Sequence, residues 1–216
     1  MDVLIDKIDD NFYYEENVQY IRVTRILNCF PKPALYNWYA THGLKECRRI
    51  QKESREFGTN MHTKIHANLD GALAEQMPDM NDARMIGTMK EFMSWKTKNK
   101  PVPIHLEYSI VNKEDMYGGT IDFIGTINGV KTIADWKSSG GIYDDYPLQL
   151  AAYHRAYKLM HPDEEPIKEG RIVCFRCDKD GKCKTIEETY SVARLEDLYS
   201  VFLAVKKTYE YKYGVK

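Results

Sequence analysis

The dipeptide Asn128-Gly129 separates two runs of residues that are rich in Ile, Val and Thr. This pattern is a strong short-range signal for a β-hairpin with a two-residue type I′ turn. If these residues form the turn, Ile127 pairs with Val130, and the same register places Asp122 directly opposite Asp135. Directly opposed residues share a face, with Cβ atoms about 5 Å apart, so two like charges there destabilise the hairpin unless another group compensates.

Strand alternation places Lys137 on the same face as the two aspartates. The opposite face is expected to be apolar and to enter the core through Ile121, Phe123, Ile127, Val130, Ala134 and Trp136. Two interpretations of the charged face follow from the hairpin alone. It is either an ion-paired surface in contact with solvent, or a divalent-cation site, because Mg²⁺ and Mn²⁺ prefer carboxylate oxygens with water and substrate phosphate.

The length of 216 residues suits a single domain that can bury a sizeable core. A net charge of −1 gives no bulk electrostatic argument for nucleic-acid binding, although a local basic patch remains possible. The acidic first ten residues lack the apolar stretch of a signal peptide, and no apolar run reaches the roughly 20 residues that span a bilayer. We therefore expect a cytoplasmic protein with no membrane partner.

Periodicity and capping residues predict a chain in which helices precede and follow a set of strands. The expected elements are short strands over 2–21 with a turn at Asp9-Asp10, a helix capped by Thr24, helices over 33–42 and 44–56, a separate helix capped by Thr59, a helix over 82–98, a strand over 104–111, the Asn128-Gly129 hairpin, a helix over 147–160, a hairpin over 171–189 that turns at Asp180-Gly181, and a helix over 194–212. This order predicts an α/β or α+β fold with a central mixed sheet flanked by helices.

Cys174, Cys177 and Cys183 have a spacing that could indicate metal or iron–sulfur ligation. Alternation within the second hairpin sends Cys174 and Cys177 to opposite faces, so these thiols would not converge on a metal. We therefore expect no iron–sulfur cluster. Cys177 and Cys183 could lie near each other across the turn, but in a reducing compartment we expect free thiols and no disulfide.

Four motifs occur in an order that resembles the RecB-like exonuclease branch of the PD-(D/E)XK nuclease superfamily. They are G-T-N-M-H with His62, G-G-T-I-D with Asp122, A-D-W-K with Asp135 and Lys137, and P-L-Q-L-A-A-Y with Gln149 and Tyr153. The sequence is most similar in these motifs to mitochondrial genome maintenance exonucleases and related phage exonucleases. The resemblance covers about residues 20 to 180. In members of the branch that carry an iron–sulfur cluster, the three cysteines lie near the C-terminus, whereas Cys174, Cys177 and Cys183 lie inside the second hairpin.

This resemblance implies a restriction-endonuclease-like core within a single nuclease domain spanning 1–216, with N-terminal elements over 1–80, a catalytic core over about 100–190 and the C-terminal helix over 194–212. It implies Mg²⁺ or Mn²⁺ bound by His62, Asp122, Asp135 and the Trp136 backbone carbonyl, with a supporting role for Glu107. It further implies a catalytic Lys137 that orients or deprotonates water, with Gln149 and Tyr153 positioning Lys137 and the DNA backbone, and products with 5′-phosphates.

Other residues fit DNA binding less specifically. Ser138 and Ser139 could donate to a phosphate, and Trp38, with Tyr36 and Tyr39, could stack on bases, although loop serines are commonly solvated and aromatic residues at helical spacing are commonly in the core. The basic residues of 45–55 could follow phosphates or lie on a solvated helix. We interpret His66, His105 and His154 as structural.

Three functions stay open at this point. The first is a metal-dependent DNA exonuclease that acts on free ends, mainly of single strands, in recombination, repair or replication, with a recombination or helicase partner. A helicase would have to be a separate protein because no nucleotide-binding G-x-x-x-x-G-K-[ST] loop occurs. The second is a structure-specific or restriction-like endonuclease on the same core, and the third is a non-catalytic nucleic-acid-binding adaptor.

Overall fold

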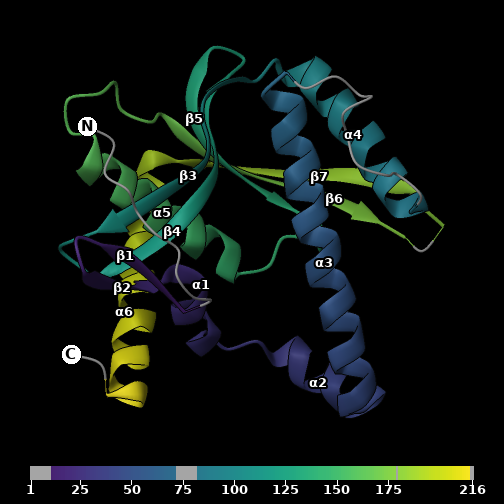
Figure 1. Ribbon diagram of the computed structural model, residues 1–216, viewed down its shortest axis with the longest axis horizontal. Helices are drawn as coiled ribbons and strands as arrows, with labels where there is room; N and C mark the ends of the chain where they lie inside the picture. Colours follow the sequence, from purple (N-terminus) through teal and green to yellow (C-terminus); the bar gives the residue numbers. More distant parts are fainter. Residues whose placement is uncertain (1–10, 72–81, 179, 215–216) are drawn as a thin grey trace.

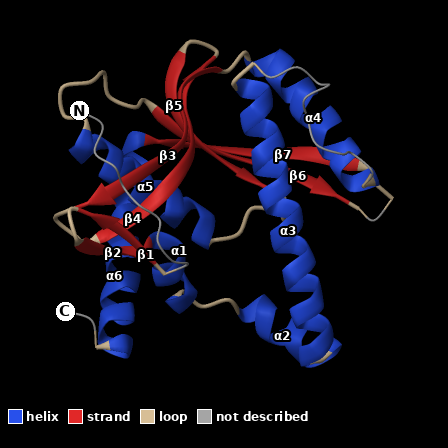
Figure 2. Ribbon diagram, viewed as in Figure 1, coloured by secondary structure: helices blue, strands red, loops and turns tan. Residues whose placement is uncertain are grey.

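The computed structural model describes residues 11–71, 82–178 and 180–214, in which helices cover both faces of a seven-stranded sheet (Figures 1 and 2). The strands are β1 (Phe12–Glu15), β2 (Val18–Arg22), β3 (Val102–Asn112), β4 (Tyr117–Ile127), β5 (Val130–Lys137), β6 (Glu169–Cys177) and β7 (Cys183–Ser191). The helices are α1 (Val23–Ile26), followed by a 3-10 turn (Leu27–Cys29), α2 (Pro33–His42), α3 (Leu44–Leu69), α4 (Ala83–Asn99), α5 (Asp145–Met160) and α6 (Val192–Tyr213).

The sheet is mixed, with the strand order β1-β2-β4-β5-β6-β7, and β3 pairs with β4. The β2–β4 and β5–β6 pairs are parallel and the others are antiparallel. Helix α5 connects the parallel strands β5 and β6, so the carboxyl end of β5 lies where α5 begins. The fold is therefore mixed α/β with a central sheet flanked by helices, consistent with the expected restriction-endonuclease-like core.

The hairpin predicted from Asn128-Gly129 is confirmed. Asn128 and Gly129 have φ angles of +52° and +81°, as a type I′ turn requires. Ile127 pairs with Val130, and the ladder continues in the expected register to Phe123 opposite Ala134.

Two hydrophobic clusters fill the space on either side of the sheet. One joins the sheet to α5 and α6, and the other joins it to α3 and α4 (Figure 1). The hairpin face that carries Asp122 and Asp135 also carries Ile124 and Ile133, each two residues from an aspartate and fully buried in the first cluster. The outward-pointing Val130 is 38% exposed and is not a core residue. A solvated charged face is also wrong, because Asp122 and Asp135 are only 8% and 2% exposed.

Several helices match the sequence expectations. Helix α2 begins at Pro33 and ends before Gly43, and α6 buries the expected apolar stripe of Leu195, Leu198, Phe202 and Val205. Helix α1 begins at Val23, one residue before the expected cap.

Two sequence expectations about local structure need correction or fall outside the described residues. One continuous helix, α3, replaces the two separate helices expected over 44–56 and after Thr59. Met61, Ile65 and Leu69 pack on the sheet and hold this helix beyond Gly58. The turn expected at Asp9-Asp10 lies outside the described residues, and β1 and β2 are joined at Glu16 and Asn17.

The cysteine expectations are only partly correct. Cys177 and Cys183 face each other across β6 and β7 and form a disulfide, contrary to the expectation of free thiols. The Sγ atom of Cys177 lies 3.1 Å from the hydroxyl of Thr88 in α4, whereas that of Cys174 lies 3.2 Å from the carbonyl oxygen of Ser139. The separate surroundings of these two sulfur atoms agree with their predicted orientation on opposite faces.

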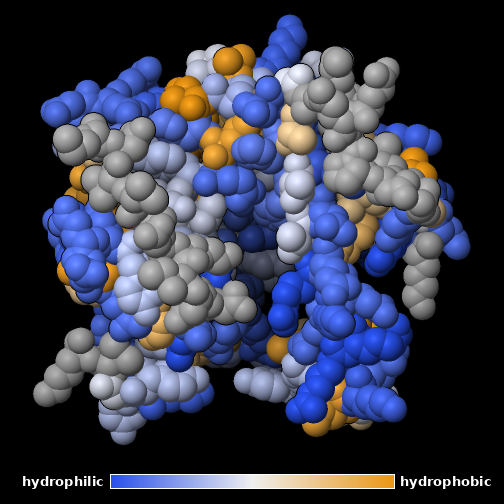
Figure 3. All heavy atoms as spheres, in the orientation of Figure 1, coloured by the Kyte–Doolittle hydropathy of each residue, from blue (hydrophilic) through white to orange (hydrophobic). Residues whose placement is uncertain are grey.

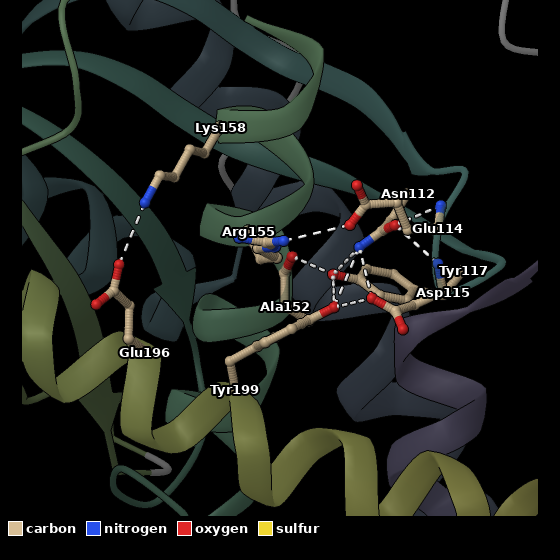
Figure 4. Close-up of polar contacts among 9 residues, drawn as sticks. All are labelled: Asn112, Glu114, Asp115, Tyr117, Ala152, Arg155, Lys158, Glu196 and Tyr199. Carbon is tan, nitrogen blue, oxygen red and sulfur yellow. Dashed lines mark hydrogen bonds and ion pairs between the residues drawn. The ribbon is translucent and has the colours of Figure 1, made fainter. Parts of the chain in front are cut away.

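A buried polar network fixes α5 against the sheet and α6 (Figure 4). The amide of Asn112 donates to the hydroxyls of Tyr117 and Tyr199 over 3.0 and 3.1 Å, and the Tyr117 hydroxyl donates to the Ala152 carbonyl oxygen over 2.9 Å. Asp115 accepts a hydrogen bond from Tyr199. Because Ala152 lies between Gln149 and Tyr153, this network helps to set the position of the helix that carries both residues.

Candidate functional site

The site lies where α3 crosses β3 and β4. His62 of α3, Glu107 of β3 and Asp122 of β4 each offer one ligand atom within 4.8 Å of the others. These three residues, called the trio below, are the group found among the described residues that could hold a metal ion. Two of its members come from the expected metal set, and Glu107 is the residue that was expected to have only a supporting role.

Asp122 is held in place by its two neighbours. Its Oδ2 accepts a hydrogen bond of 2.8 Å from the backbone N–H of Trp136, and its Oδ1 lies 3.3 Å from Nδ1 of His62. The carboxylate therefore lies against β5 next to Asp135, as the hairpin register predicts. Burial acts to raise the pKa of Asp122, but His62, Lys137 and the Trp136 N–H hold it below its ordinary value.

Glu107 reaches the site through an unusual backbone conformation. Its φ is +48°, a left-handed value that is rare for a residue within a strand. The pairing of β3 with β4 also shifts by one residue between Pro103 and His105, and beyond this shift Leu106 pairs with Phe123 and Tyr108 with Ile121. Glu107 is thus opposite Asp122, and its Oε1 lies 3.7 Å from Nδ1 of His62.

Asp135 and Lys137 lie behind this trio and form an ion pair, with Oδ2 and Nζ 2.6 Å apart. Lys137 donates to Oε1 of Gln149 over 2.9 Å, and Nε2 of Gln149 donates to the Tyr153 hydroxyl over 2.9 Å. These contacts join four of the five expected catalytic side chains, and Asp122 is held next to them by the N–H of Trp136. Asp135 does not belong to the trio of ligand atoms, although its charge contributes to the raised pKa of His62.

The pKa values reflect the balance of burial and charge. Burial raises the pKa of Asp135 to about 6, with Lys137 opposing the increase and Asp122 adding to it. Burial acts to lower the pKa of Lys137, but Asp135 and Asp122 outweigh it and raise that pKa. The raised pKa favours the ammonium form of Lys137, which suits charge stabilisation and the orientation of water. Burial also acts to lower the pKa of His62, but Asp122 and Glu107 raise it to about 10.

Tyr146, in the first turn of α5, is a site residue that the sequence did not indicate. Its ring centroid lies 4.6 Å from Nζ of Lys137, a distance at which a cation is attracted to an aromatic ring. Tyr146 is three residues before Gln149 on the same helix, so both contact Lys137 from one side. Its spacing to Gln149 is the only sequence signal that could have suggested this contact.

The residues expected to bind nucleic acid differ in position. Ser138 faces α3, since a Cβ on Gly58 would lie 3.6 Å from its Oγ, and the Ser139 hydroxyl donates to the Gly141 carbonyl oxygen over 2.7 Å. Trp38 belongs to α2, at the far end of α3 (Figure 1). With a rise of 1.5 Å per residue, the start of α3 is about 27 Å from His62, so Trp38 lies outside the trio's surroundings.

A pocket of about 490 Å³ opens beside the trio. Its lining consists of Gly58, Thr59, His62, Thr63, His66 and Glu107. In the space-filling view, the middle of the face is hollowed and most of the surface around the hollow is hydrophilic (Figure 3). The pocket shares His62 and Glu107 with the trio, so a ligand in it would contact two of the three potential metal ligands.

The donor set fits a divalent cation. Two carboxylates supply hard oxygen ligands, and the imidazole of His62 is compatible with Mn²⁺ once the metal displaces its proton. Oδ2 of Asp135 is buried, and its partner among the described residues is the Lys137 ammonium at 2.6 Å. A cation near Asp122 and Asp135 would compensate these buried charges.

No family model and no curated protein matches the sequence. Among solved structures, the chain is similar to an alkaline exonuclease (LHK-Exo) from Laribacter hongkongensis, with a TM-score of 0.39 and 14% identity over 89% of this chain and 90% of that chain. For the complex of LHK-Exo with dAMP, the TM-score is 0.30 and the identity 12% over the same shares. These TM-scores are too low to support a function, which must be argued from the site.

Within the described residues, no helix is long and apolar enough to cross a membrane.

Proposed function

We propose that this chain is a Mg²⁺- or Mn²⁺-dependent deoxyribonuclease that removes nucleotides from free ends of single-stranded DNA and leaves 5′-phosphates. The observation that carries the proposal is the trio of His62, Glu107 and Asp122, directly in front of a buried Asp135–Lys137 pair. The PD-(D/E)XK motifs in the sequence support the same chemistry. A role in DNA recombination, repair or replication, with a separate helicase or recombination partner, belongs to this proposal.

His62, Glu107 and Asp122 would hold the cation, with Asp135 completing the negative site. A bound Mg²⁺ or Mn²⁺ supplies Lewis-acid polarisation of the phosphate and a more acidic water. The ammonium of Lys137 stabilises negative charge that develops on the phosphate, as preorganised charges do in buried sites. Gln149 and Tyr146 keep that ammonium directed at the site.

The test compares end-labelled linear DNA with circular single-stranded DNA, each with Mg²⁺, Mn²⁺ or EDTA. We expect metal-dependent digestion of the linear substrate only, and loss of at least 100-fold in rate for Asp135→Asn and Lys137→Ala, as is typical when a key electrostatic group is removed. Asp197→Asn is a matched control, because Asp197 is an exposed carboxylate on α6.

Each contrary outcome identifies a different function. Cleavage of circular DNA would indicate that the protein is an endonuclease on the same core and not an exonuclease. DNA binding without cleavage, unaffected by Asp135→Asn, would indicate a non-catalytic adaptor. Faster digestion of RNA than of DNA would overturn the proposed substrate.

A further inference from the structure

Three polar residues of the pocket beside the trio have no role in the proposed chemistry. Thr59, Thr63 and His66 share a face of α3 with His62, because residues three and four apart lie one above the other on a helix. They extend the site along α3 on both sides of His62. Their position raises the question of what occupies the pocket of about 490 Å³.

The lining restricts the chemistry of the occupant. Apart from Gly58, every lining residue carries a polar group, a threonine hydroxyl, an imidazole or the Glu107 carboxylate, so a purely apolar ligand would leave polar groups without partners. Thr63 donates its hydroxyl hydrogen to the Thr59 carbonyl oxygen over 3.0 Å, which leaves the Thr63 oxygen able to accept a hydrogen bond. The volume is within the range of about 300–1,000 Å³ that is usual for small-molecule sites.

Charge gives the ligand an orientation. His62 and Glu107 line the pocket and belong to the trio, where the proposed cation would attract an anion. The remaining lining residues, Gly58, Thr59, Thr63 and His66, include no carboxylate or ammonium group. A ligand with one anionic end and a polar, planar remainder matches this arrangement.

We propose that this pocket binds the nucleotide attached to the scissile phosphate, with its phosphate at the trio and its base against the imidazole of His66. Planar bases stack on aromatic side chains, including His, without regard to sequence. The Thr63 oxygen accepts from the sugar or base. This inference depends on the proposed nuclease function and assigns its substrate subsite, in which His66 is a substrate-binding residue and not a purely structural one.

The first experiment measures binding of the mononucleotide dTMP in the presence of Mn²⁺ by titration calorimetry. We expect His66→Ala to weaken dTMP binding by about tenfold, the lower part of the range for loss of one base–aromatic stack. Asn60→Ala is the matched control, because Asn60 is an exposed residue of the same helix that lines a different pocket. Thermal unfolding and Mn²⁺ affinity should be the same in both variants and the wild type, and unchanged dTMP affinity in His66→Ala would overturn the proposal.

The second experiment uses linear single-stranded DNA whose terminal nucleotide lacks a base. If the base stacks on His66, removal of the base and His66→Ala should each raise KM by about tenfold, and the two changes together should raise it no further. Fully multiplicative effects would overturn the stacking contact. If the protein shows no metal-dependent digestion while His66→Ala still weakens dTMP binding, the nuclease function fails and the nucleotide pocket stands.

Discussion

The contact between Gly119 and Tyr153 offers a sharp test of how the fold positions Lys137. A Cβ added to Gly119 would lie 2.3 Å from Cε1 and 2.9 Å from Cζ of Tyr153. Carbon atoms in contact need about 3.5–4.0 Å, so the ring must move by more than about 1 Å. Tyr153 is only 4% exposed, so this movement occurs inside a packed core.

Gly119→Ala should therefore have two separable effects. Overpacking of a core costs about 1–3 kcal/mol in the free energy of unfolding. The ring shift also breaks the 2.9 Å hydrogen bond from Gln149 to Tyr153, and with it the support of Lys137. A misplacement of about 1 Å in a catalytic group can lower kcat by about 100-fold.

Urea unfolding and single-stranded DNA digestion measure the two effects in the same samples. Gly141→Ala is the control for stability, because no heavy atom lies within 4 Å of the added Cβ. In a Tyr153→Ala background, Gly119→Ala should cost much less stability, since the colliding ring is gone. Wild-type stability together with wild-type kcat in Gly119→Ala would refute both the close contact and its role in positioning Lys137.

Three further predictions concern other parts of the molecule. Burial lowers the pKa of His154 from 6.5 to about 4, so the unfolded state binds a proton first as pH falls. The contribution of His154 to the free energy of unfolding should be complete above pH 6.5 and decrease by up to about 3 kcal/mol towards pH 4. Urea unfolding of His154→Gln should show a correspondingly smaller decrease over this pH range. Tyr146→Leu should lower kcat by about tenfold through loss of the cation–ring contact, whereas Tyr146→Phe should retain wild-type kcat, and equal losses in both variants would contradict the contact. Cys177→Ser should lower the free energy of unfolding by about 2 kcal/mol, the value that the chain-entropy model gives for so short a loop. Urea unfolding under non-reducing conditions would measure this change, and a midpoint identical to that of the wild type would argue against the disulfide in solution.

Much of the site could be predicted from sequence because local rules determine it. Asn128-Gly129 permits two successive positive φ angles, and this alone sets the register that brings Asp122 beside Asp135. Pro147 lies in the first turn of α5, and helical spacing then places Gln149 and Tyr153 on one face. These features depend on residues that are close in the chain.

Features that depend on long-range packing could not be predicted. Gly58 and Thr59 carry the local signals of a break and a cap, yet burial of Met61 and Ile65 against the sheet outweighs a cost of about 1 kcal/mol for a glycine within α3. The contact of Tyr146 with Lys137 depends on how residues 138–144 return the chain to the site. The oxidation state of Cys177 and Cys183 depends on the compartment as well as on the hairpin register.

Glu107 shows how the site departs from regular strand geometry. A left-handed residue costs about 1–2 kcal/mol relative to an ordinary strand conformation, and β3 contains one at the point where it faces Asp122. Backbone strain of this kind persists where the surroundings require it, which is common at functional sites. The conformation directs a carboxylate towards His62 and Asp122, and thereby adds negative charge to a site that already holds two buried aspartates. Lys137 and the protonated form of His62 offset part of this charge. A cation bound at the trio would offset it further, so the backbone of β3 and the carboxylates of β4 and β5 are both compatible with a metal at the same place.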